Sequence, residues 1–120
     1  MTADVRWQQR FSNFCRALEQ LEGFFEPPEL NDREQQGLIK AFEYCFELGW
    51  NTLREAYRLG LLSDGEAWML MIQDRNLTAH TYNRATAESI AGNSRERHRP
   101  CFHQLRERLQ ERQQQEQGLS

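Results

Sequence analysis

Apolar residues recur along the chain at spacings of three and four, which is the period of a helix with one buried face. The first stripe runs from Trp7 to Phe25, and the "EPPEL" that follows it cannot continue a helix. Runs of alternating β-branched residues, which would indicate strands, are nearly absent. The pattern therefore predicts helices throughout.

A second helix is predicted to begin near Asn31. Glu34 follows Asn31 by three residues, a spacing typical of a capping box. The apolar stripe of this helix runs from Leu38 to Tyr57. Gly49 lies in its middle and is unfavourable there unless another backbone packs closely against it.

Two further helical stretches complete the pattern. "SDGE" is typical of a helix start, and Trp68, Met71 and Arg75 follow along the predicted helix. A short piece, "ATAESIA", is expected to end at Gly92, before a last helix that runs through Leu109. The sequence thus predicts an all-α domain, a bundle of four main helices over residues 1–110, and a polar tail over 111–120 that frays.

Composition restricts the class of protein further. The chain has 120 residues, of which 38% are hydrophobic and 28% are charged, as expected for one globular domain. No apolar run has the length of a membrane span, and the start lacks the apolar centre of a signal peptide, so we expect a soluble, cytoplasmic protein with no membrane contact. The three cysteines have no metal-ligand spacing and are interpreted as small hydrophobic residues, and the three tryptophans as core.

Charge is unevenly distributed. The formal net charge of −3 argues against bulk electrostatic binding of nucleic acid. Residues 17–47 contain eight acidic side chains against two basic ones, whereas from residue 91 onward six arginines stand against four glutamates. The Arg-rich part can face a phosphate chain or simply form a solvated helix face, and charge alone does not decide. His98 and His103 in this part show no spacing that suggests catalysis or metal binding.

The stretch "DRNLTAHTY" places Arg75, Asn76, His80 and Tyr82 within eight positions, directly after the apolar run "AWMLMI". On an ideal helix Arg75 and His80 point ~140° apart, because five residues separate them. Three explanations remain open: an irregular helix, an Arg75 side chain that reaches around, or two motifs from two chains that face one another.

These residue types suit a phosphodiester. A guanidinium binds phosphate oxygens, and an imidazole takes or gives a proton near neutral pH. In RNA the neighbouring 2′-OH is a built-in nucleophile, so neither a metal nor a protein nucleophile is required. Asn76 can orient either group, and Tyr82 can bind substrate or be modified. The alternative is a purely structural role, in which these side chains form a hydrogen-bonded cluster between helices.

The motif and its neighbours closely resemble a known family. Together with "RWQQRFSNFCRALEQLE", "FEYCFELGWNTL" and "DGEAW", "DRNLTAHTY" resembles the HEPN-domain proteins encoded beside minimal nucleotidyltransferases, first described as nucleotidyltransferase substrate-binding proteins. The resemblance extends to about Ala91. It implies an up-and-down four-helix bundle that forms homodimers. In this chain "WNTLREAYRLGLL" directly fuses two blocks that family members keep apart.

The resemblance also implies roles for residues. The family motif R-x4-H-x-Y is matched by Arg75, His80 and Tyr82, and its polar residue by Asn76. In the toxin branch, Arg and His form a metal-independent ribonuclease site at the dimer interface, without a cofactor. The neighbouring nucleotidyltransferase acts as the antitoxin by transferring AMP to the tyrosine, here Tyr82.

Three functions therefore remain open for this chain. It is a toxin-type ribonuclease held in check by a nucleotidyltransferase, a non-catalytic subunit that binds substrate or nucleotide for that partner, or a purely structural dimer.

Overall fold

A computed structural model of the protein describes residues 2–58, 65–80 and 83–118, and all regular structure in these ranges is helical. The elements are α1 (Thr2–Gly23), α2 (Asp32–Arg58), α3 (Gly65–Leu77), the 3-10 helix η1 (Thr78–His80), α4 (Arg84–Asn93), the π-helical segment η2 (Ser94–His98) and α5 (Arg99–Gly118).

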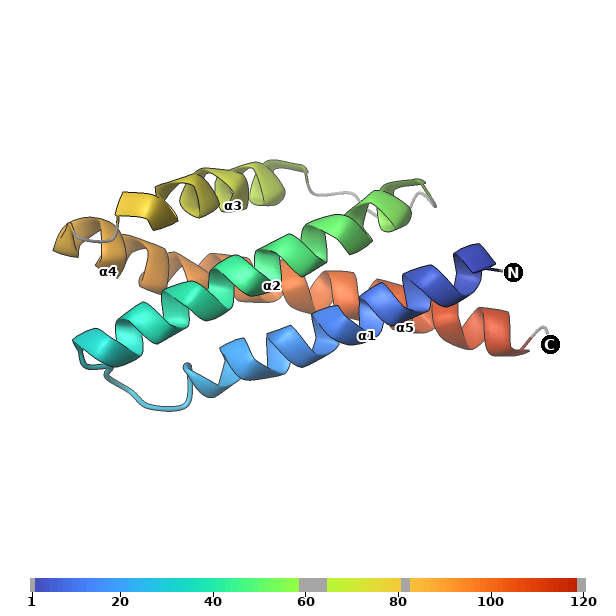
Figure 1. Ribbon diagram of the computed structural model, residues 1–120, viewed down its shortest axis with the longest axis horizontal. Coiled ribbons are helices and arrows are strands. Elements are labelled where there is room, and N and C mark those ends of the chain that lie inside the picture. Colours follow the sequence, from blue (N-terminus) through green and yellow to red (C-terminus); the bar gives the residue numbers. More distant parts are fainter. Residues whose placement is uncertain (1, 59–64, 81–82, 119–120) are drawn as a thin grey trace.

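The helices form an elongated bundle of 50 × 25 × 22 Å. Successive long helices run in opposite directions, and both ends of the chain lie at the same end of the bundle (Figure 1). α4, η2 and α5 follow one another without a break and together make the fourth member of the bundle. The predicted all-α, four-helix architecture is confirmed.

The core is centred on the ring of Phe102 from α5. Phe14 of α1, Phe42 of α2 and Trp68 of α3 contribute rings at centroid distances of 5.9, 6.4 and 6.0 Å from it. All four side chains are buried, and burial of large aromatic side chains is the main stabilising contribution in a bundle of this size. One residue thus joins all four helices.

Local signals in the sequence explain the start of α2. The Asn31 amide N–H donates to Glu34 Oε1 at 3.0 Å, and the Glu34 N–H donates to Asn31 Oδ1 at 2.8 Å. This reciprocal pair is the predicted capping box, which satisfies two N–H groups that the helix itself cannot pair.

Gly49 is accommodated by a side chain rather than by a backbone. A Cβ atom at this position would lie 3.0 Å from Cε1 and 3.3 Å from Cδ1 of the Phe14 ring. The absence of a side chain therefore lets α1 bring an aromatic ring close to α2. The close approach that the sequence analysis required is present, but its partner differs.

The α-helix α4 ends at Asn93, one residue after the predicted end at Gly92, but the chain stays helical there. Residues on one face, among them Ala87, Ile90 and Ser94, are buried, and this burial outweighs the cost of about 1 kcal/mol for glycine in a helix. The helical run continues through η2 into α5 as far as Gly118, across most of the segment expected to form a polar tail.

Other buried residues agree with their interpretation as core. Trp7 and Trp68 are buried, and Trp50 is half-buried and stacks on Phe46 at 5.8 Å. Cys45 is fully buried, and burial raises the pKa of its thiol. Within the described residues, no helix combines the length and apolarity that crossing a membrane requires.

Candidate functional site

The motif lies where α3 ends and changes its geometry. α3 stops at Leu77, and Thr78, Ala79 and His80 form the 3-10 turn η1. The Thr78 hydroxyl donates to the Arg75 carbonyl oxygen at 2.7 Å and so satisfies one acceptor at the end of the helix. Asn83 then caps α4 by accepting from the N–H groups of Ala85 and Thr86. Arg75 and Asn76 therefore lie in the last turn of α3 and His80 lies at the end of η1.

The irregular geometry was one of the three explanations for the five-residue spacing. It does not turn His80 toward Arg75, however. A 3-10 turn has three residues per turn, so ideal geometry leaves the two side chains on roughly opposite sides of the helical axis.

Arg75 is paired with an acidic residue from another helix. Its Nη2 donates to Glu47 Oε1 on α2 at 2.9 Å. The side chains of Arg75 and Glu47 are 37% and 51% exposed, so solvent and solutes reach both. Exposed ion pairs of this kind are worth about 0–1 kcal/mol, and a competing anion can displace the carboxylate. Arg75 also lies in the last turn of α3, where its charge complements the helix dipole.

Asn76 and His80 are both exposed. Asn76 belongs to an exposed stripe of α3 in which Gln73 follows Met69 by four residues, and Asn76 and Leu77 follow Gln73 by three and four. Met69 is 58% and Leu77 is 42% exposed, which is unusual for large apolar side chains. Tyr82 lies outside the described residues. The structure thus gathers Arg75, Asn76 and His80 within one turn and a half, with Arg75 engaged by Glu47.

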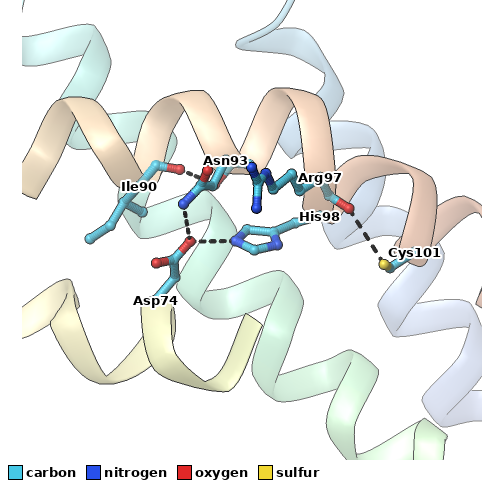
Figure 2. A network of polar contacts seen from close by, with 7 residues as sticks. Asp74, Ile90, Asn93, Arg97, His98 and Cys101 are labelled. Atoms are coloured by element: carbon cyan, nitrogen blue, oxygen red, sulfur yellow. Dashed lines mark hydrogen bonds and ion pairs between the residues drawn. The ribbon is translucent and has the colours of Figure 1, made fainter. Parts of the chain in front are cut away.

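Beneath the motif lies a buried polar network that sequence reasoning missed (Figure 2). The Asp74 carboxylate is buried, and its Oδ2 accepts from Asn93 Nδ2 at 3.0 Å. The same oxygen lies 2.6 Å from Nε2 of His98, which is 0% exposed. The His98 ring stacks on Phe42 at a centroid distance of 5.1 Å. We call Asp74, Asn93 and His98 the buried triad.

The charge state of His98 follows from its surroundings. Burial lowers the pKa of His98, the hydrogen bond and charge of Asp74 raise it again, and the net shift is downward. The imidazole is therefore neutral at pH 7 and donates its Nε2–H to the Asp74 carboxylate. Its Nδ1 is buried without a hydrogen-bond partner in the described part of the chain. In the neutral ring this atom carries no proton, and burying it unpaired costs less free energy than burying the N–H of a charged imidazolium would.

A signal for the buried triad was present in the sequence. Asp74 follows Trp68 and Met71 at spacings of three, so it continues the buried row of α3, in which the sequence analysis had placed Arg75 instead. His98 likewise falls on the row that joins Ser94 to Phe102. A charged or polar residue on an apolar row indicates a buried partner, although periodicity does not say which residue that partner is.

The Arg-rich part of the chain is largely engaged within the molecule. Arg95 donates to the carbonyl oxygens of Phe25 and Pro27 at 3.2 and 3.3 Å. Arg99 lies 2.6 Å from Glu22 of α1, and His103 contacts the same carboxylate. Burial raises the pKa of Glu22, but the hydrogen bonds from His103 and Arg99 outweigh it and leave that pKa lowered. Arg95 thus ties η2 to the segment after α1, and Arg99 and His103 tie α5 to α1, which favours a structural role for these side chains.

A separate hollow of about 510 Å³ lies between α1 and α2. Its described lining residues are Gln20, Phe24, Gly37, Lys40, Ala41 and Tyr44, so none of the described motif residues contributes to it. In the described ranges, no group of three or more His, Cys, Asp or Glu side chains could hold a metal ion.

Comparison with known proteins identifies the family. A family model described as nucleotidyltransferase substrate binding protein like matches residues 9–56 and 51–111. The two ranges overlap at residues 51–56, within the stretch where the sequence analysis found two blocks fused. No curated protein matches the chain significantly. The matched ranges include most of the chain and all of the motif, and the protein therefore belongs to the nucleotidyltransferase substrate-binding protein-like family.

Proposed function

We propose that the protein is a subunit that works with a minimal nucleotidyltransferase and binds an RNA or nucleotide around the end of α3, where Arg75 binds a phosphate and the exposed Asn76 and His80 contact other parts of the same ligand. The observation that carries this proposal is the half-exposed Arg75 guanidinium, whose partner among the described side chains is the exposed Glu47 carboxylate. A phosphate oxygen can replace that carboxylate on the same donor, since both are anionic acceptors. The family to which the chain belongs supports the partner.

Binding requires less of the site than cleavage does. A phosphate needs only an accessible cation, which the half-exposed Arg75 supplies, and Asn76 and His80 can contact other parts of the ligand. Cleavage requires an Arg and a His at the same phosphate, whereas Arg75 and His80 of one chain lie on roughly opposite sides of the helical axis. The binding role is therefore our first candidate.

Metal-independent RNA cleavage is the second candidate, and the exposed His80 imidazole favours it. In a homodimer, Arg75 of one protomer and His80 of its partner could meet across a two-fold axis and form one composite site. His80 would then transfer a proton during attack of the 2′-OH on the phosphorus, while Arg75 would stabilise the charge that develops. By resemblance, Tyr82 would accept AMP, and the added phosphate would compete with RNA for Arg75.

Binding is tested with a short fluorescein-labelled RNA and fluorescence anisotropy on the full chain. We expect Arg75→Ala to weaken binding about tenfold, because a hydrogen bond to a charged group is lost. Affinity should also fall as salt rises. Equal affinity of the wild type and Arg75→Ala would exclude the phosphate site.

Cleavage is tested by incubating the same proteins, with His80→Ala added, with mixed cellular RNA in EDTA. Cleavage by the wild type alone, leaving 2′,3′-cyclic phosphate and 5′-OH ends, would establish the ribonuclease. RNA that is bound but stays intact would establish the binding subunit. A folded wild type that neither binds nor cuts RNA or nucleotide would leave a structural role.

A further inference from the structure

The buried triad and the π-helical segment η2 explain one another. Asn93 and His98 are five residues apart, so on a regular α-helix their side chains would point ~140° away from each other. In η2 the Arg99 N–H instead donates to the Ser94 carbonyl, a pairing of residues five apart. Residues five apart thus come to lie on one face, and Asn93 and His98 reach the same Asp74 oxygen (Figure 2).

The position of Asp74 connects this network to the motif. Asp74 directly precedes Arg75, and the two side chains leave α3 in different directions, Asp74 into the core and Arg75 toward α2. A buried carboxylate requires its donors, because an unpaired charge in the core is costly. The rotation and height of the last turn of α3 are therefore set by the fourth helix of the bundle.

We infer that Asn93 and His98 are positioning residues, which act through Asp74 to fix the end of α3 and so direct Arg75 toward Glu47 and toward the phosphate. Neither residue touches the ligand in this arrangement. The part of the inference that concerns the phosphate rests on the proposed function. The part that concerns the geometry of Arg75 and His80 does not.

The chain offers a matched control for this role. His103 on α5 also contacts a carboxylate on another helix, but its partner is Glu22 of α1, and no motif residue takes part. Loss of either histidine removes a bridge between helices. Only the loss of His98 should disturb the motif.

The test uses the full chain with His98→Leu, His98→Gln and His103→Leu. Leucine removes the donor to Asp74, whereas the glutamine amide can replace Nε2 as a donor. The readouts are the Arg75 Nε–Hε and His80 ring signals by NMR, and the anisotropy of labelled RNA. Both are measured well below the unfolding temperature of each variant.

We expect His98→Leu to shift the Arg75 and His80 signals and to weaken RNA binding about tenfold, as small displacements of a binding group can. His98→Gln should restore both to within about twofold of the wild type. His103→Leu should lower the unfolding temperature and leave both readouts unchanged.

A folded His98→Leu with wild-type signals and affinity would overturn the inference, as would equal changes in His98→Leu and His103→Leu. If His98→Leu does not fold, Asn93→Ala replaces it, because it removes one of the two donors at a half-buried site. Wild-type signals in Asn93→Ala would then also overturn the inference. Should Arg75→Ala leave RNA affinity unchanged, the proposed function fails, and the NMR signals alone decide the role of His98.

Discussion

Two carboxylates near Arg75 differ in their surroundings and therefore in what they do. Asp74 is buried and binds two donors from the fourth helix of the bundle, whereas Glu47 is exposed and binds Arg75 alone among the described ion pairs. An exposed carboxylate exchanges readily with other anions, and a buried one does not. Asp74 thus belongs to the scaffold, whereas under the proposed function Glu47 would compete with the phosphate for Arg75.

Replacing Glu47 by glutamine should raise RNA affinity about two- to fivefold, because an exposed ion pair of about 0–1 kcal/mol no longer competes for Arg75. Anisotropy with labelled RNA measures this. The matched control is Glu88→Gln, which removes the same charge from the exposed Arg84–Glu88 pair at 3.2 Å. An equal gain in both variants would reflect net charge rather than competition at Arg75.

Because the pKa of His98 is lowered in the folded protein, we expect the free energy of unfolding to depend on pH. Between this lowered pKa and the ordinary value of about 6.5, the unfolded chain binds more protons than the folded one. The free energy of unfolding should therefore fall as the pH decreases through about 6.5 toward the lowered pKa of His98. Urea titrations should show a weaker decrease in His98→Gln, since glutamine does not titrate. Identical pH dependence in both proteins would contradict the neutral, buried histidine.

Among the elements, α2 contains a glycine, a residue of low helix propensity, at a position where a neighbouring helix packs closely. Gly49 is buried and lies against the Phe14 ring, which itself packs on Phe102 in the centre of the core. Because Phe14 is fully buried, its ring has little room to move away from an added methyl group.

Gly49→Ala should destabilise the fold by about 1 kcal/mol, because overpacking outweighs the better helix propensity of alanine. Gly92→Ala is the matched control, since a Cβ there would meet nothing within 4 Å. It should stabilise the fold by up to about 1 kcal/mol. Thermal unfolding of both variants measures the difference. A stabilised Gly49→Ala would contradict the prediction and show that the Phe14 ring moves aside for the added methyl group.

Residue patterns within one helix predicted where the helices lie, but they did not predict which residues make contact between helices. The capping box of Asn31 and Glu34 involves residues three apart, so its chemistry is legible in the sequence. The helix did not end at Gly92, because burial of the flanking residues against other helices decided its course. The partners of Arg75 and His98 lie 28 and 24 residues away, and no spacing rule connects them.

For the whole molecule, the exposed stripe of α3 is the surface that bears on assembly. Met69 and Leu77 flank Asn76 there, next to the motif. A homodimer in which two motifs face one another would cover these apolar side chains and bring Arg75 of one protomer near His80 of its partner. The proposed dimer therefore makes use of the one stripe on α3 that a monomer leaves in solvent.

Sedimentation of the wild type should give twice the chain mass of 14.3 kDa. Met69→Glu should shift it to the monomer, because a charge on an apolar interface is costly, while the fold is retained since Met69 is exposed. Gln9→Glu, an exposed position on α1, adds the same charge and should leave the dimer intact. A monomeric wild type, or a dimeric Met69→Glu, would place assembly elsewhere.

The π-helical segment also determines how the length of this chain can vary. A π-turn is one residue longer than the α-turn that it replaces, so deleting exposed Glu96 would convert η2 to a regular helix without breaking the run into α5. The deletion would keep the helix and place His98 four residues after Asn93, a spacing that a regular α-helix holds on one face. A single codon thus separates this π-helical segment from a regular α-helix that presents the same two donors to Asp74, and η2 is a place where the length of the chain can change by one residue while the buried network is kept.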